Sequence, residues 1–164
     1  MNYTDRFLRI EHVTGKKLVG SNLRMSRISG SPQVAWQKFM PLRHKIIDAV
    51  STDLISLHDY PQGYFEKFDP TKEFEYWALQ EVKDHNNLPE GLTPFTLESG
   101  DYAVFLHRGS SADMSLFQYI FGEWIPSSEY NIDHRPHFEV LGQRYKQGDP
   151  ISEEEIYIPI KHKP

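Results

Sequence analysis

Two Phe-Glu pairs each place a carboxylate inside an apolar run of strand-forming residues. The first lies in EFEYWALQEV (Glu73–Val82) and the second in HFEVLGQ (His137–Gln143). Successive side chains of a strand point to opposite faces, so each Glu can share a face with apolar neighbours. A carboxylate in such surroundings is poorly solvated. It can attract a cation or, with a raised pKa, act as a general acid or base. Glu75 and Glu139 are therefore the first candidates for chemistry.

Other titratable groups give weaker signals. His134 and His137 in HRPH are three residues apart, a spacing that suits a metal site on a helix, but Pro136 breaks helical geometry there. We predict a surface turn and no metal site. Glu155 belongs to the acidic run SEEEI, which is typical of a solvated turn. Gly109 is not followed by a P-loop lysine and no G-x-S-x-G elbow occurs, so we predict no cofactor.

Composition narrows the class of protein. The 164 residues are 38% hydrophobic and 13% aromatic and carry a net charge of −5, and a basic stripe for nucleic acid is not visible. Cysteine is absent, which excludes disulfides, thiolate nucleophiles and Cys-based zinc sites. The N-terminus does not read as a signal peptide, and no apolar run reaches the ~18 residues of a membrane span. We therefore expect a cytoplasmic protein that binds neither nucleic acid directly nor membranes.

The candidate acids must be positioned by strands that alternate with two helices. A helix is predicted over 32–47, with Ser31 as its cap, Pro32 at its first position and a kink at Pro41. A second helix is predicted over 112–125, because apolar residues recur there at helical spacing, and Pro126 should end it. Extended segments are predicted over 7–25 with a break at Thr14-Gly15, and over 53–61, 74–82, 101–109, 137–143 and 154–160.

The order strand, helix, strand, strand occurs twice. It predicts one α+β domain over residues 1–164, built from two β-α-β-β units of about 5–83 and 96–161, with an antiparallel sheet around a central cavity. An α+β domain with a coincidental order is the alternative. In the repeat, segment 137–143 corresponds to 53–61 and segment 154–160 to 74–82. That register matches Trp77 with Tyr157 and Glu75 with Glu155.

Several segments together resemble the GyrI-like small-molecule-binding family. They are SGDYAVFLHRGS, WIPSS, HFEVLG and EEIYIPIK, supported by KLVGSNLRMS and FEYWALQEV, and they cover nearly the whole chain. This family supplies the effector-binding domains of AraC-type and MerR-type multidrug regulators. The resemblance implies a duplicated β-α-β-β fold around an aromatic cavity whose acidic residue pairs with cationic, lipophilic ligands. It fits the stand-alone binding domain, because residues 1–30 are too short and strand-like for a helix-turn-helix.

By position, the resemblance implies that Glu139 is the pocket acid and that Tyr157 is a pocket aromatic. Many relatives have Tyr two residues after the acid, where this chain has Leu141, so a tyrosine hydroxyl beside Glu139 is not implied. Strand alternation puts Glu139 on the face of His137 and Leu141. The alternative is a solvent-facing Glu139 with Phe138 packed inward.

Trp77 and Tyr102 are the further aromatic candidates for the ligand site. Their polar tips and ring faces suit a pocket that binds cations, although ordinary sheet packing is the alternative for each of them and for Tyr157. Trp36 and Trp124 lie on apolar helix faces, for which core packing is the prediction. Glu75 is a weaker candidate for a second pocket acid.

Three functions of different classes follow. The first is a binding protein for lipophilic, cationic small molecules, acting alone or through an unidentified protein partner. The second is a small-molecule hydrolase that uses Glu139, and the third is a protein that modulates gyrase, as the family's namesake does. An enzyme should show a second polar group within reach of Glu139 and an opening for water. A pure binding site should show a single acid in an apolar cage.

Overall fold

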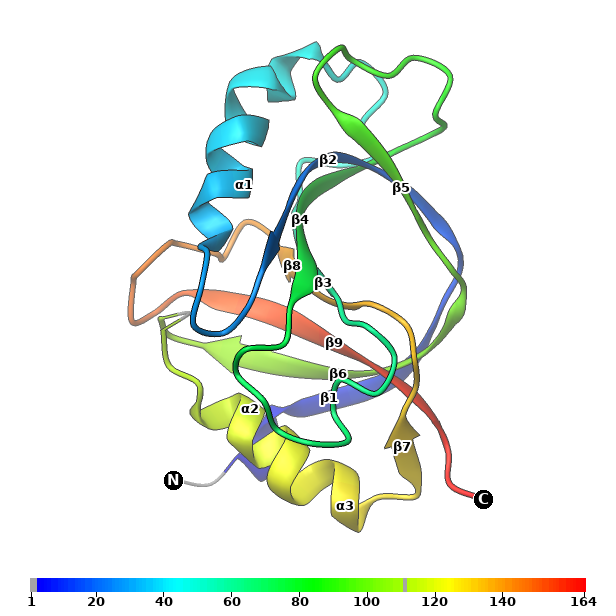
Figure 1. The fold of residues 1–164 in the computed structure, drawn as a ribbon, viewed down its shortest axis with the longest axis vertical. Helices are drawn as coiled ribbons and strands as arrows, with labels where there is room; N and C mark the ends of the chain where they lie inside the picture. Colours follow the sequence, from blue (N-terminus) through cyan, green and yellow to red (C-terminus); the bar gives the residue numbers. More distant parts are fainter. Residues whose placement is uncertain (1–2, 111) are drawn as a thin grey trace.

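The computed structural model describes residues 3–110 and 112–164 as an antiparallel sheet with helices (Figure 1). None of the helices in these residues is long and apolar enough to span a bilayer. The strands are β1 (Phe7–Val13), β2 (Lys16–Met25), β3 (Leu54–Asp59), β4 (Phe74–Val82), β5 (Thr93–Leu97), β6 (Gly100–Arg108), β7 (Tyr130–Ile132), β8 (His137–Leu141) and β9 (Glu153–His162). The helical elements are η1 (Thr4–Arg6), α1 (Pro32–Phe39), η2 (Met40–Lys45), α2 (Ser115–Tyr119), η3 (Ile120–Trp124) and α3 (Ile125–Ser127).

The strand order of the sheet is a palindrome. It runs β1-β6-β9-β8-β3-β4-β2-β5, with β7 paired to β9 outside this path. If β2, α1, β3 and β4 are matched with β6, α2, β8 and β9, the second half of the order repeats the first in reverse. The leading strands are exchanged, since β1 pairs with β6 and β5 pairs with β2. The α+β prediction with duplicated β-α-β-β units is confirmed, as is the matching of β3 with β8 and of β4 with β9.

The sheet has a different core on each face. On one face α1 packs on β2 and β4, and the rod formed by α2, η3 and α3 covers β6 and β9, giving two separate apolar clusters. On the other face a single cluster, here called the strand core, is built from strand residues of both halves. Figure 1 shows the two helical parts far apart, at the top and bottom of the view. The two central strands, β3 and β8, therefore lie between the helices.

The first helix ends earlier than its hydrophobic spacing predicts. Ser31 caps it as expected, because its Oγ accepts a hydrogen bond from the Gln33 N–H at 3.3 Å. The α-helix ends at Phe39, and residues Met40–Lys45 continue as a 3-10 helix with Pro41 at its second position. Pro41 cannot donate a backbone hydrogen bond and its ring crowds the preceding turn, which accounts for the predicted break.

The second helical rod runs past the proline that was predicted to end it. It starts at Ser115, whose N–H donates to the Asp113 carboxylate at 3.0 Å, and ends at Ser127. Within it the Ile125 N–H donates to the Ile120 carbonyl, five residues back, which makes a π-turn. The wider turn fits the position before Pro126, because a proline lacks the N–H that an α-helix would use there.

We predict that Gly20 cannot be replaced without disturbing the pairing of β2 with β4. A Cβ at Gly20 would overlap the carbonyl oxygen of Ala78 on β4. Gly20→Ala should therefore lower the free energy of unfolding by about 2–3 kcal/mol, as overpacking does. Gly122→Ala is the matched control, since a Cβ there meets no described atom within 4 Å. It lies in the helical rod and should stabilise the protein by about 0.5–1 kcal/mol. Urea unfolding of both variants checks this, and equal stabilities would contradict it.

Candidate functional site

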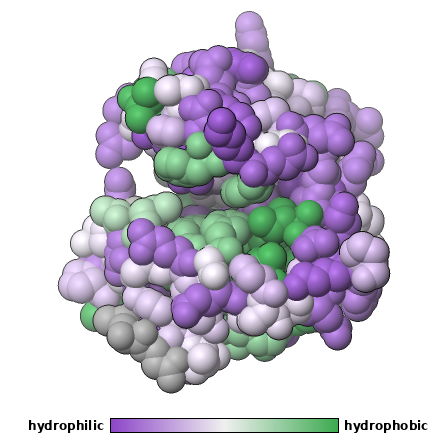
Figure 2. All heavy atoms as spheres, turned by 60° about the horizontal axis from the view of Figure 1, so that its bottom comes forward, coloured by the Kyte–Doolittle hydropathy of each residue, from purple (hydrophilic) through white to green (hydrophobic). Residues whose placement is uncertain are grey.

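A cavity of about 520 Å³ lies on the helix-bearing face, above the central strands. Its walls come from the loop 26–31 and α1 of the first half and from α2 of the second. Its floor comes from β3, β4, β8 and β9, and the loop after β8 contributes to the rim. Figure 2 shows a face of the molecule hollowed between its upper and lower parts, with apolar residues gathered along the hollow. The cavity thus occupies the space that the two separate helices leave open.

Glu139 lies in the cavity floor, at the middle of the sheet. On β8 it is paired with Ser56 of β3 on one side and with Ile156 of β9 on the other. His137 and Leu141 also line the cavity, so Glu139 has the predicted facing. It is half-buried because the cavity opens onto it. Burial raises the pKa of its carboxyl well above the ordinary range, and the negative charge and hydrogen-bonding of Glu154 raise it further.

Glu154 is a second acid in the same cavity. Its side chain lines the same cavity from β9, the strand paired with that of Glu139, and the residue is only 6% exposed. The acidic run SEEEI predicts a solvated turn, and that prediction is wrong. The strand β9 already begins at Glu153, so alternation turns Glu154 inward with Ile156. The signal that was missed is that Glu154, Ile156 and Ile158 are alternate residues of one strand and so share a face.

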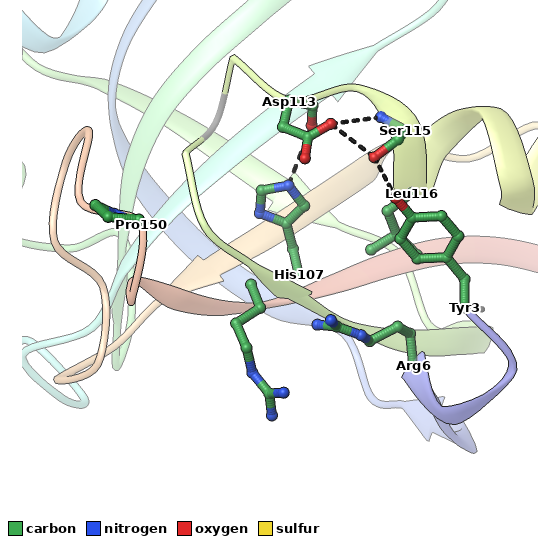
Figure 3. Close-up of a pocket in the computed structure, with 8 residues that line it drawn as sticks. Tyr3, Arg6, His107, Asp113, Ser115, Leu116 and Pro150 are labelled. Carbon is green, nitrogen blue, oxygen red and sulfur yellow. Dashed lines mark hydrogen bonds between the residues drawn. The ribbon is translucent and has the colours of Figure 1, made fainter. Parts of the chain in front are cut away.

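His107 lies behind Glu154 on the neighbouring strand β6, directly opposite it in the sheet. Its Nδ1 is 3.3 Å from Oε1 of Glu154 and makes no hydrogen bond to the described residues. Its Nε2 faces the backbone carbonyl of Asp113 at 3.2 Å (Figure 3). The adjacent Glu154 carboxyl group raises the pKa of His107 above its ordinary value, against the opposing effect of burial. His107 also lines a smaller pocket of about 220 Å³ on the other side, which includes Tyr3 and Arg6.

A hydrogen-bonded aromatic wall stands on the α1 side of Glu139. The Trp36 indole N–H donates to the Tyr76 hydroxyl at 2.9 Å, and the Ser56 hydroxyl is 2.6 Å from the same oxygen. All three residues line the cavity. Trp36 was predicted to pack in the core. It does pack against the apolar cluster beside α1, but it is only half-buried, because its ring also lines the cavity. Tyr76 was missed because Trp77, its neighbour on β4, was predicted to face the cavity, and adjacent strand residues point to opposite faces.

Two histidines stand in an aromatic part of the cavity floor. His58 stacks with Tyr60 at 5.6 Å, and His137 stacks with Phe65 at 5.1 Å between ring centroids. Burial lowers the pKa of each histidine to about 3, so both are neutral at physiological pH. The HRPH motif was predicted as a surface turn. His134 is exposed as expected, but His137 is buried because it is the first residue of β8.

The three predicted aromatic candidates lie on the opposite face of the sheet. Trp77, Tyr102 and Tyr157 all belong to the strand core and do not line this cavity. Tyr157 stacks on Phe138 at 4.5 Å, and the Tyr102 hydroxyl donates to the Pro136 carbonyl at 3.0 Å. The placement is thus corrected, and cross-strand pairing explains it. Tyr157 is paired with Phe138, not with Glu139, and paired residues share a face.

The remaining predicted acids lie outside the cavity as well. Glu75 accepts hydrogen bonds from Asn22 at 3.0 Å and from Arg24 at 3.2 Å on the face of the strand core. Glu155 accepts one from Arg9 at 2.6 Å. Of the described residues, no three or more His, Asp or Glu side chains are arranged to hold a metal ion. Of the five predicted ligand-site residues, the structure brings together Glu139 and Leu141.

Comparison with known protein families and sequences gives one family and one regulator. The family model described as Cass2, integron-associated effector binding protein, matches residues 9–160. The transcriptional regulator BrlR of Pseudomonas aeruginosa is 30% identical over 128 residues, which is 76% of this chain and 44% of BrlR. The chain therefore spans less than half the length of that curated relative.

Solved structures show the same fold at low sequence identity. An integron cassette protein of Vibrio cholerae matches with a TM-score of 0.63 and 17% identity, covering 94% of this chain and 96% of that one. The structure of SAV2435 bound to tetraphenylphosphonium matches with a TM-score of 0.64 and 16% identity, covering 93% of each chain. The EcmrR C-terminal domain matches with a TM-score of 0.67 and 10% identity, covering 94% of this chain and 97% of that one.

We predict that the buried histidines make the protein labile to acid. A histidine with a depressed pKa in the folded state contributes stability that is present above its unfolded pKa of about 6.5 and is lost as pH falls toward its folded pKa of about 3. His58→Phe keeps an aromatic ring and removes the titrating group. Between about pH 7 and pH 5, the variant should lose about 1–2 kcal/mol less unfolding free energy than the wild type.

Urea unfolding at several pH values measures this difference. His44→Phe, at an exposed position, is the matched control and should follow the wild-type slope. If His58→Phe and the wild type lose stability in parallel, His58 is not held neutral by its surroundings.

Proposed function

The chain belongs to the Cass2 family of integron-associated effector-binding proteins, and from this premise we propose that it binds lipophilic cations between its two halves. Glu139 is the electrostatic anchor of the proposed site, and Leu141 adds apolar contact beside it. The observation that carries the proposal is a carboxyl group in the floor of a large cavity with aromatic walls. The tetraphenylphosphonium bound by SAV2435, which has the same fold, is a ligand of this class.

The physical basis is the poor solvation of a carboxylate in this cavity. Water cannot fully solvate Glu139 there, so a cation that enters with an apolar shell restores the electrostatic balance. Aromatic faces such as those of Trp36 and Phe121 add cation–π attraction of about 1–2 kcal/mol each at desolvated positions. His58 and His137 do not repel a cation, because their lowered pKa values keep them neutral. The volume of about 520 Å³ suits a drug-sized ligand.

A second candidate function is hydrolysis of a small electrophilic compound. The observation that favours it is Glu154, a second polar group within reach of Glu139 in a cavity that opens to solvent. A protonated carboxyl beside a carboxylate can act as an acid-base pair, with Glu139 as the general acid or base. Turnover of ester and strained-ring substrates by the wild type, lost in Glu139→Gln while ligand binding is retained, would support hydrolysis over binding alone.

We predict that Glu139→Gln selectively weakens the binding of cations. The substitution preserves size and removes the charge, and breaking a buried ion pair typically costs ~3–5 kcal/mol. Even half of that cost would weaken the binding of tetraphenylphosphonium or a rhodamine-type cation by roughly tenfold or more. Neutral triphenylphosphine oxide should be affected much less, because its aromatic contacts survive. Fluorescence or calorimetric titration at about pH 8 measures these affinities.

Glu75→Gln is the matched control. Glu75 also follows Phe in a strand, but it faces away from the cavity toward Asn22 and Arg24. This variant should bind the cations as the wild type does. Equal affinities of wild type and Glu139→Gln for both cations would mean that Glu139 is not the anchor.

A further inference from the structure

Glu139 and Glu154 together restrict the charge of the cavity floor. Glu139 is paired with Ile156, so Glu154 is its diagonal neighbour on the adjacent strand and lines the same cavity. Two neighbouring carboxylates in a poorly solvated site do not both stay ionised, because the like charges repel and neither donates a hydrogen bond. One shared proton removes the repulsion and supplies the donor. Oε2 of Glu154 is buried and accepts no hydrogen bond from any N–H or O–H group of the described residues. A proton on Glu139 is therefore well placed to be shared with Glu154.

His107 determines which of the two acids holds the negative charge. The Asp113 carbonyl only accepts hydrogen bonds, so Nε2 of His107, which faces it at 3.2 Å, carries a proton. Nδ1 faces Oε1 of Glu154 at 3.3 Å, and this contact is favourable when Nδ1 is protonated too. His107 is 3% exposed and thus is a buried counter-cation for Glu154. This geometry favours the negative charge on Glu154, beside His107, and the shared proton on Glu139.

Other polar groups around the two acids do not replace His107 as the counter-cation. The uncharged Ser56 faces it from β3, and Tyr76 from β4 is bonded to Ser56 and Trp36. The titratable or charged groups that line the cavity or face the two acids are His137 on β8, His58 on β3, Tyr60 after β3, Tyr76 on β4, Tyr145 after β8, His107 on β6 and Arg27 in the loop 26–31. Both cavity histidines are neutral, the pKa of each tyrosine is raised by burial, and Arg27 is exposed.

We propose that Glu154 is a second acid of the ligand site, whose negative charge keeps a proton on Glu139 while no cation is bound, so that ligand binding exchanges one proton for one cation. The inference rests on the proposed function and goes further, because it states what leaves when the ligand enters. On binding, the O–H bond of Glu139 breaks and its electron pair stays on the carboxylate. The proton passes to solvent, and the cation takes its place beside Glu139. The His107–Glu154 pair keeps its charges.

This exchange selects ligands by charge. With Glu139 ionised, the two carboxylates and the His107 imidazolium sum to one negative charge, which one monocation neutralises. A neutral ligand of the same shape leaves the proton on Glu139 and exchanges nothing. Cation affinity should rise about tenfold per pH unit below the pKa of Glu139 in the free protein and level off above it, since only the ionised form binds.

Isothermal titration calorimetry of the full chain with tetraphenylphosphonium tests the exchange directly. This cation has no titratable proton, so any proton transferred to the buffer comes from the protein. Titrations between about pH 5 and pH 8, each in two buffers of different ionisation enthalpy, give the number of protons released. For the wild type we expect this number to approach one proton per bound cation on the acid side of the Glu139 pKa. Binding of the neutral triphenylphosphine oxide should release no proton.

Glu154→Gln removes the second acid and leaves Glu139 in place. A Gln amide can donate a hydrogen bond to the Glu139 carboxylate, so Glu139 should ionise at a lower pH and proton release at about pH 6 should largely disappear while binding is retained. Glu155→Gln, one residue along β9 and on the opposite face, is the matched control and should release as many protons as the wild type.

The outcomes separate this inference from the function on which it rests. Cation binding by the wild type with no proton release at any pH between about 5 and 8 would overturn the exchange and leave the binding function intact. Absence of cation binding would overturn both. The wild-type measurement alone decides between these results, so the test does not depend on whether Glu154→Gln folds.

Discussion

The antiparallel pairing of β3 with β8 is the interaction on which the rest of the structure depends. It joins the two halves at the centre of the sheet, from Leu54 opposite Leu141 to His58 opposite His137. Because α1 is only eight residues long and packs on β2 and β4, it covers its own half and not this junction. The rod in the other half does the same. A sheet continuous across the junction, with helices that stop short of it, necessarily carries a cavity there. The floor of that cavity is formed by whichever side chains β3 and β8 turn toward the helices.

The floor residues are ones that a protein core usually excludes. Glu139 and His58 are half-buried and His137 is buried, and each has a pKa moved toward its neutral form. Such groups cost free energy of folding, which apolar packing elsewhere must offset. The strand core on the opposite face provides this apolar packing, with Leu57 and Phe138 buried directly behind the floor residues. One face of the same strands thus stabilises the fold and the other carries the proposed binding site.

The sequence indicated the elements well because hydrophobic spacing and prolines act locally. The strand Phe74–Val82 has the expected bounds, and Glu139 has the expected facing. The assignment of aromatic residues failed because it needed the register between strands that lie far apart in the chain. Trp77 and Tyr157 do occupy corresponding strands, but which face those strands turn to the cavity depends on the pairing of Phe138 with Tyr157. Glu154 was missed because the acidic run was taken for a solvated turn, although alternation along the predicted strand 154–160 already places Glu154 on the face of Ile156.

The exchange of β1 and β5 between the halves bears on how the site can adapt to ligands of different size. Each half contributes an edge strand to its counterpart, so the halves are interlocked at both outer edges as well as joined in the middle. A hinge opening of the two halves would break backbone hydrogen bonds in three strand pairs at once, β1–β6, β2–β5 and β3–β8. That costs far more free energy than a change of side-chain rotamer. Adjustment to a ligand therefore falls to the rotamers of the cavity aromatics and to the loops at its rim. The sheet under the site is thus fixed, while the side chains and loops around it can adjust. Such an arrangement suits the proposed ligands, which share a charge and differ in shape.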